Sequence, residues 1–186
     1  MAKRFSELND QHIRFIARQK IFFVGTAAAE SRVNVSPKGM DSLRVLDSHR
    51  VVWLNVTGSG NESSAHVQQN ARMTIMFCAF EGLPLILRLY GTARVIHPRD
   101  AEWAELYALF PALPGARQIF DLSVDLVQTS CGQAVPLYTY EGDRNDLNEW
   151  AIEKGEDGLQ KYHEEKNQTS MDGLPTHILL TAEPGE

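Results

Sequence analysis

The chain has 186 residues, of which 43% are hydrophobic and 23% charged, and its formal net charge is −6. This composition is typical of one globular domain, and the acidic balance excludes a general nucleic-acid binder, which needs a concentrated basic face. No apolar run approaches the roughly 20 residues of a membrane helix, and the N-terminal residues lack the apolar core of a secretory signal. Cys78 lies inside the apolar run MTIMFCAF, as buried thiols do in a reducing compartment, so we expect a cytoplasmic protein.

Hydrophobic periodicity divides the chain into short strands and a few helices. In chain order we expect a helix over 6–20, strands over 21–29, 32–36, 42–46 and 50–56, a helix over 61–70, strands over 72–80 and 84–96, a helix over 100–110, a strand over 120–126 and helical residues over 143–167. Gly91, inside an expected strand, predicts a bulge or a close backbone approach. Gly155 and Gly158 predict a break in the last helix, and the turn-forming residues after Met171 predict a poorly ordered tail.

The order of these elements favours one class of fold. Six or seven strands with few helices between them indicate an antiparallel sheet, because parallel strands need long crossover connections. Such a sheet tends to close into a barrel, since closure removes its edges. We therefore expect a single α+β domain, mainly β, that is built on an antiparallel β-barrel and spans residues 1–186.

The motif GSGNES lies between an expected strand and an expected helix. Its Gly-x-Gly is half of a dinucleotide-binding fingerprint, but Ser63 stands where the third glycine belongs and no βαβ unit precedes it, so a Rossmann site is rejected. The backbone N–H groups of a helix start, with Asn61, Ser63 and Ser64 as further donors, can still bind an anion such as phosphate. The alternative is an ordinary capped turn that serves only the helix.

Two cations lie six residues apart in NVSPKGMDSLRVLD. The corner formed by residues 37–39 would place Lys38 at the sheet edge. Antiparallel pairing of 42–46 with 50–56 would bring Arg44 near the strand that leads into the glycine turn. Both cations and the helix start could then converge on one phosphate, although each cation taken singly is more simply a surface charge.

The remaining candidates for chemistry are few. Arg88 is the only charged residue in LILRLYG, and it either pairs with an acid such as Asp125 or meets the polar edge of a ligand. The six histidines are scattered and the two cysteines lack metal-binding spacing, so no metal site is expected. No catalytic acid, base or nucleophile can be assigned.

The succession of VNVSPKGMDSLRVLD, VVWLNVTGSGNESSAHVQQNARMTIMF and LILRLYGTARVI resembles the pyridoxamine 5′-phosphate oxidase-like family of flavoproteins. The resemblance extends over about residues 15–140, which would form the barrel core. The C-terminal helices over about 143–167 and the tail over 171–186 lie outside it. The resemblance implies an FMN-binding split β-barrel that forms a homodimer with the flavin at the subunit interface.

The resemblance also implies which residues lie near the cofactor. The segment 38–44 would run along the flavin, Leu54, Asn55 and the segment 61–64 would lie near its ring and phosphate, and Arg88 would lie on a strand that reaches the ring. The expected cofactor-binding residues are Ser36, Lys38, Gly39, Met40, Asp41, Ser42, Arg44, Leu54, Asn55, Gly60, Asn61, Ser63, Ser64 and Arg88.

Two departures from the family pattern bear on the substrate. Where the oxidase has a Ser-Arg-Lys run at the helix start, this chain has Asn-Glu-Ser-Ser at 61–64, so Lys38 and Arg44 would have to neutralise the phosphate. The basic C-terminal substrate motif of the oxidase is also missing. We therefore expect an FMN-dependent oxidoreductase that acts on a small molecule other than pyridoxamine phosphate. The alternatives are a deazaflavin-dependent reductase, a non-catalytic flavin- or haem-binding module, and a ligand-free dimeric scaffold.

Overall fold

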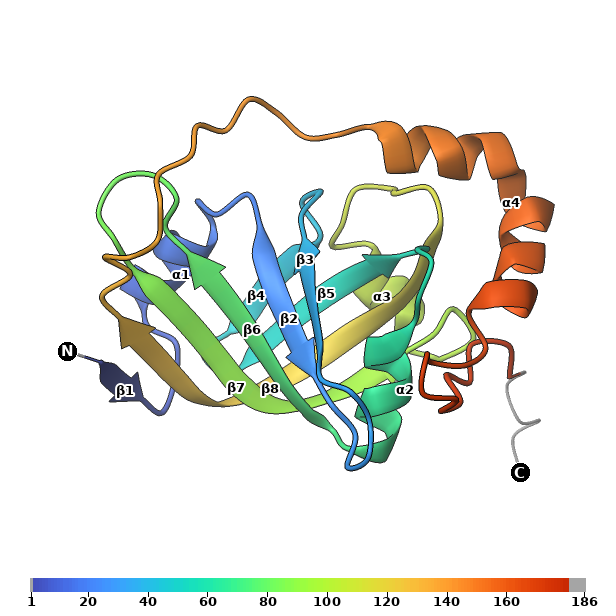
Figure 1. The fold of residues 1–186 in the computed structure, drawn as a ribbon, viewed down its shortest axis with the longest axis horizontal. Coiled ribbons are helices and arrows are strands. Elements are labelled where there is room, and N and C mark those ends of the chain that lie inside the picture. Colours follow the sequence, from blue (N-terminus) through green and yellow to red (C-terminus); the bar gives the residue numbers. More distant parts are fainter. Residues whose placement is uncertain (1, 181–186) are drawn as a thin grey trace.

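The computed structural model describes residues 2–180, and residues 1 and 181–186 lie outside the described part. It contains eight strands: β1 (Lys3–Phe5), β2 (Phe22–Thr26), β3 (Asn34–Lys38), β4 (Leu43–Asp47), β5 (Arg50–Val56), β6 (Arg72–Cys78), β7 (Ile86–Ile96) and β8 (Ala116–Ser130). The four helices are α1 (Asp10–Ile16), α2 (Glu62–Gln69), α3 (Trp103–Tyr107) and α4 (Asp146–Lys166). Figure 1 shows the strands curled around a common interior, with α4 at the side.

The strands form one antiparallel sheet in the order β3-β2-β6-β7-β8-β5-β4, and β1 adds to β8. Because β3 and β4 stand at opposite ends of this order and do not pair, the barrel is split between them. The expected antiparallel split barrel with flanking helices is therefore confirmed.

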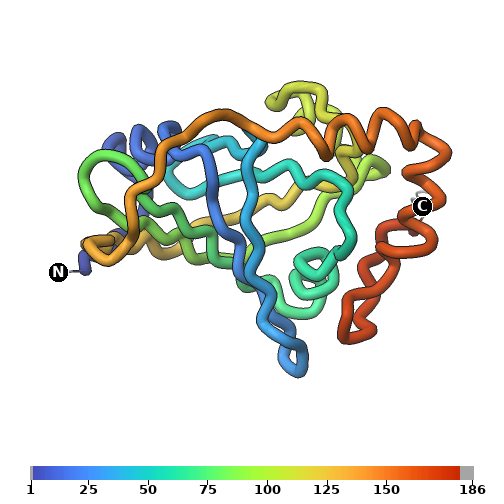
Figure 2. The backbone as a smooth tube through the Cα atoms, turned by 45° about the horizontal axis from the view of Figure 1, so that its top comes forward, coloured from blue at the N-terminus to red at the C-terminus, as the bar shows by residue number. Residues whose placement is uncertain are grey.

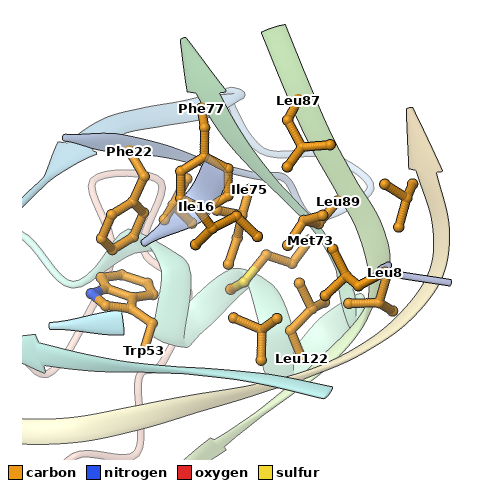
Figure 3. Close-up of a cluster of buried hydrophobic side chains, with 14 of the residues drawn as sticks. Leu8, Ile16, Phe22, Trp53, Met73, Ile75, Phe77, Leu87, Leu89 and Leu122 are labelled. Atoms are coloured by element: carbon orange, nitrogen blue, oxygen red, sulfur yellow. The ribbon is translucent and has the colours of Figure 1, made fainter. Parts of the chain in front are cut away.

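The barrel interior is filled by side chains that alternate inward along the strands. Trp53 of β5 is stacked on Phe120 of β8, with ring centroids 4.6 Å apart, and Phe22 of β2 meets it edge-on at 6.2 Å. Figure 3 shows Trp53 and Phe22, with Phe77 beside them, next to a group of leucine and isoleucine side chains. Burial of each large apolar side chain stabilises the fold by about 1.5–3 kcal/mol, so this cluster is the main source of stability.

Gly91 lies where β7 changes register against β8, between Tyr90 and Gly91. A Cβ atom at this position would lie 1.9 Å from the carbonyl oxygen of Ser123. Both features predicted for this glycine, the bulge and the close backbone approach, are thus present.

Several element boundaries differ from those expected. Strand β1 was not expected, because three residues paired only with the end of β8 carry no periodicity. Helix α1 is shorter than 6–20, since Asn9 caps it by accepting hydrogen bonds from the backbone of Gln11 and His12. Strand β3 is shifted towards the C-terminus, and Val33 and Val35 are exposed rather than buried.

The C-terminal part is more ordered than the sequence indicates. Helix α4 is kinked at Gly155, which has a φ of 64°, so the expected break is confirmed there. Residues 167–180, here called the C-terminal arm, return to α2 (Figure 2), and Thr176 is fully buried. The expected loose tail is therefore wrong for residues 171–180, and its last residues, 181–186, lie outside the described part.

Candidate anion-binding site

A cavity of about 450 Å³ lies between β3, β5, the glycine turn and the start of β8. Its volume falls within the range of small-molecule sites. Residues 36–40, with Asn34 and Ser42, form one side of the cavity, and residues 53–63 form another. Leu113, Arg117, Gln118 and, from α4, Leu147 complete it. Segments far apart in the sequence therefore meet in one polar site at the split of the barrel.

Arg117 is the strongest positive feature of this cavity. Only 5% of the residue is exposed, and its guanidinium donates to three neutral oxygens: Asn55 Oδ1 at 2.8 Å, Asn167 Oδ1 at 2.7 Å and the Gly60 carbonyl at 2.8 Å. Burial lowers the pKa of Arg117 to about 10, which still leaves it charged at neutral pH. Since a guanidinium carries five N–H groups, two remain for a ligand.

Lys38 adds a second cation at the end of β3, where it pairs with Phe22 of β2. Its ammonium lies 5.2 Å from the centre of the Trp53 ring, as in a cation–π contact. Burial, and then the charge of Arg117, lower the pKa of Lys38 to about 8. Within residues 2–180 neither cation forms an ion pair with a carboxylate, although the Glu62 carboxylate also lines the cavity.

Buried amides hold the floor of the cavity in place. Gln118 is fully buried, and its Nε2 donates to Asn61 Oδ1 at 2.6 Å and to Asn55 Oδ1 at 3.2 Å. The Oε1 atom of Gln118 has no hydrogen-bond partner among the described residues. A buried acceptor without a partner is costly, so this atom favours a ligand that can donate a hydrogen bond.

The glycine turn leads into α2 without a side-chain cap. Asn61 occupies the N-cap position, but its amide bonds to Gln118 and to the Asn167 carbonyl instead of the first turn of the helix. The first N–H groups of a helix have no intrahelical partner. They and the positive end of the helix dipole therefore favour an anion at this edge of the cavity.

The serine residues of this segment have structural contacts. The Ser63 hydroxyl bonds to Thr26 Oγ1 at 3.2 Å and accepts from Asn34 at 3.3 Å. Ser64, which does not line the cavity, donates to the Thr176 carbonyl at 3.0 Å. Each hydroxyl is thus already bonded to the surrounding structure.

Ten of the fourteen expected cofactor-binding residues line the cavity: Ser36, Lys38, Gly39, Met40, Ser42, Leu54, Asn55, Gly60, Asn61 and Ser63. The other four, which are Asp41, Arg44, Ser64 and Arg88, do not.

The structure differs most from expectation at Arg44. Strands β4 and β5 pair as expected, with Arg44 opposite Val52. The guanidinium, however, bonds to the Asp41 carboxylate at 2.8 and 2.9 Å and to the Leu109 carbonyl, and it lies over the ring of Phe110. Arg44 therefore does not converge with Lys38 on the cavity, and Arg117 occupies the place that the sequence suggested for it.

Arg88 lies on the outer face of β7, away from the cavity. It donates to the Ser130 hydroxyl at 3.2 Å, and among residues 2–180 it makes no ion pair with Asp125 or another acid. The structural alternative proposed for it from the sequence is therefore wrong, and its contact with a ligand stays a prediction.

Sequence reasoning missed three residues of the site: Arg117, Gln118 and Asn167. Arg117 and Gln118 open β8 with two adjacent polar side chains, which breaks the alternation that marks the rest of this strand. Asn167 does not line the cavity, but from the C-cap of α4, 50 residues after Arg117, it accepts a hydrogen bond from this arginine. The one sequence signal for the site was Arg117 itself, a charged residue just before the alternating residues 120–126 of β8.

Among residues 2–180 no group of three or more histidine, cysteine, aspartate or glutamate side chains could hold a metal ion. In the same range no helix is long and apolar enough to span a bilayer.

A split antiparallel barrel with a cationic cavity beside a helix start defines the class of fold, and comparison with known proteins identifies the family. A family model described as pyridoxamine 5′-phosphate oxidase matches residues 8–131. The pyridoxamine 5′-phosphate oxidase family protein ustO of Aspergillus flavus is 36% identical over 191 residues, covering 92% of this chain and 76% of that protein. The chain therefore belongs to the pyridoxamine 5′-phosphate oxidase-like family.

Solved structures share the fold at lower identity. HupZ of Group A Streptococcus is 21% identical with a TM-score of 0.51, over 64% of this chain and 91% of HupZ. A protein of Lactobacillus delbrueckii named after pyridoxamine 5′-phosphate oxidase is 20% identical with a TM-score of 0.54, over 66% of this chain and 94% of that protein. At this identity the similarity shows the fold alone.

Proposed function

We propose that this protein is a cytoplasmic FMN-dependent oxidoreductase and that FMN binds in the cavity at the split of the barrel. One observation carries the proposal: Arg117 is buried in the cavity wall, is held by neutral oxygens only and has two N–H groups left for an anion. Burying an unpaired charge is costly, so a site that maintains one is suited to a ligand of opposite charge.

The residues present fit the phosphate and the polar edge of FMN. Arg117, Lys38 and the first N–H groups of α2 would hold the phosphate, and the free Oε1 of Gln118 would accept a hydrogen bond from the ligand. The flavin supplies the hydride or electron chemistry when it is bound. The chain itself binds and orients the cofactor, excludes water and sets the charge around it.

The substrate is proposed to differ from pyridoxamine phosphate. Glu62 stands in the first turn of α2 and lines the cavity, so a second anionic group there would meet a carboxylate. The C-terminal arm packs against α2 through Thr176 and lacks the basic motif expected of the oxidase. The site is therefore better suited to bind the phosphate of the cofactor alone than to bind a phosphorylated substrate as well.

We further propose that the protein forms a homodimer. Val33 and Val35, at the edge strand β3, are 73% and 64% exposed, and unpaired edge strands with exposed apolar side chains tend to associate. Arg88 is remote from the cavity of its own chain and would approach a flavin only across such an interface. Sedimentation at micromolar concentration tests this proposal, and a monomer would contradict it.

The visible absorption spectrum of the purified protein, followed by mass spectrometry of the compound released by acid, tests the cofactor. Two flavin bands and released FMN are expected, with oxidation of a reduced nicotinamide by the holo-protein as the sign of turnover. A colourless protein that takes up no added FMN would contradict the proposal. Deazaflavin and haem would then be titrated, although no histidine among the described residues lines the cavity.

A further inference from the structure

We propose that Asn167, at the end of α4, is a positioning residue that aims Arg117 at the anion while leaving its charge unneutralised. The inference deepens the proposed function and rests on it, because the anion is taken to be the phosphate of FMN. It assigns a part of the site to a segment beyond residues 8–131, the range that the family model matches.

Asn167 links three separate parts of the cavity wall. Its Oδ1 accepts from Arg117 Nη1 at 2.7 Å, and its Nδ2 donates to the Gly58 carbonyl at 3.1 Å. Its carbonyl accepts from Asn61 Nδ2 at 3.5 Å and from Thr176 Oγ1 at 2.6 Å. Asn167 is fully buried. The Asn167 side chain thus ties the arginine to the glycine turn, and its backbone carbonyl ties the same residue to the start of α2.

The C-terminal arm keeps Asn167 in place without help from Arg117. Thr176 is held by Ser64 and Gln68 of α2, which both donate to its carbonyl. Asp172 pairs with Arg32 and accepts from its backbone N–H. These contacts order the arm on α2, so the Asn167 amide is already in place before an anion binds. Because Asn167 holds the flexible side chain of Arg117, this side chain loses less conformational entropy on anion binding than an unrestrained arginine would.

The uncharged nature of Asn167 is as important as its position. An aspartate at 167 could still accept from Arg117, but its second oxygen would face the Gly58 carbonyl without a proton to donate. Its charge would also neutralise the guanidinium and repel a phosphate. Neither His163 nor Glu62 forms an ion pair with Arg117 among residues 2–180. The pKa of His163 is lowered to about 4 by burial and by Arg117, so this imidazole is neutral at pH 7, and the Glu62 carboxylate is bonded to the Met171 N–H.

The test compares Asn167→Asp and Asn167→Ala with wild type, using FMN, riboflavin and inorganic phosphate as ligands. Asn145→Asp, the same chemical change at an exposed position before α4, is the matched control. We expect the FMN affinity to fall at least tenfold in Asn167→Asp and by less in Asn167→Ala, with riboflavin affinity changed less than twofold. The ratio of FMN to riboflavin affinity is the decisive readout, because a loss of structure alone would lower both.

Two results would overturn the inference. One is an Asn167→Asp variant that binds FMN as tightly as Asn167→Ala or wild type, and the other is an equal loss of FMN and riboflavin affinity. If wild type takes up no FMN, the proposed function fails, and stabilisation by inorganic phosphate in thermal unfolding decides the inference. Stabilisation that is lost in Asn167→Asp supports it, and stabilisation that persists in this variant, or is missing in wild type, overturns it.

Discussion

Lys38→Met tests whether the cavity holds a buried cation without a counter-ion. In the folded protein the pKa of Lys38 is lowered from its ordinary 10.5 to about 8, first by burial and then by the charge of Arg117. At about 1.4 kcal/mol per pH unit, this difference corresponds to at most about 3.5 kcal/mol, and partial solvent access to the amine reduces it. The methionine side chain has a similar length and carries no charge.

The sign of the effect follows from proton binding. At pH values between about 8 and 10.5 the unfolded chain holds a proton that folded Lys38 has released, so the free energy of unfolding of wild type rises with pH in this window. The variant lacks this contribution. Relative to Lys38→Met, wild type should therefore gain about 1–3 kcal/mol of stability between pH 7 and pH 10.

Urea unfolding followed by tryptophan fluorescence, in steps of half a pH unit, measures this difference. Lys154→Met, which removes an exposed lysine of α4, is the matched control and should follow wild type at every pH. Parallel profiles for wild type and Lys38→Met would refute the reasoning, because they would mean that Lys38 titrates alike in the folded and unfolded chains.

Three further predictions concern the site and the sheet. Arg117→Met should weaken FMN binding about 100-fold, as expected for the loss of a charge-assisted contact of about 3 kcal/mol, and fluorescence titration showing an unchanged dissociation constant would contradict it. Gly91→Ala should cost about 3 kcal/mol or more in urea unfolding, because its Cβ would meet the Ser123 carbonyl at 1.9 Å; wild-type stability would exclude the close approach. Asp121→Asn should lower the free energy of unfolding by about 3 kcal/mol at pH 7. Burial raises the pKa of Asp121, but the hydrogen bonds from Arg50 and Arg94 outweigh burial and hold the pKa below its ordinary value. An unchanged melting temperature would contradict this prediction.

Local patterns were sufficient to predict most of the fold. Alternating strands, the short helix after the glycine turn and the kink at Gly155 all follow from residues that are close together in the chain. Strand β3 was misplaced because alternation alone cannot tell which face is buried. The Asn34 side chain faces α2 and donates to Ser63, and Val33 and Val35 on either side of it are exposed.

The site was predicted only where its parts are local. The corner after β3 and the glycine turn carry recognisable residues, whereas the side chain that supplies the buried charge comes from β8 and its orienting amide from α4. Arg44 was expected in the site because it follows Lys38 closely in sequence, whereas Arg117 lies far along the chain from both. The structure shows that an acidic neighbour, Asp41, already binds Arg44, and no sequence pattern distinguishes a paired arginine from an unpaired one.

Calorimetric titration of the protein with FMN and with riboflavin at pH 7 tests the central claim most directly, since the two ligands differ only in the phosphate. The cationic cavity predicts that FMN binds about 100-fold more tightly than riboflavin, because the phosphate pairs with Arg117 and Lys38. Equal affinities for the two ligands, or no binding of either, would contradict the claim that this cavity is built for the phosphate of a flavin.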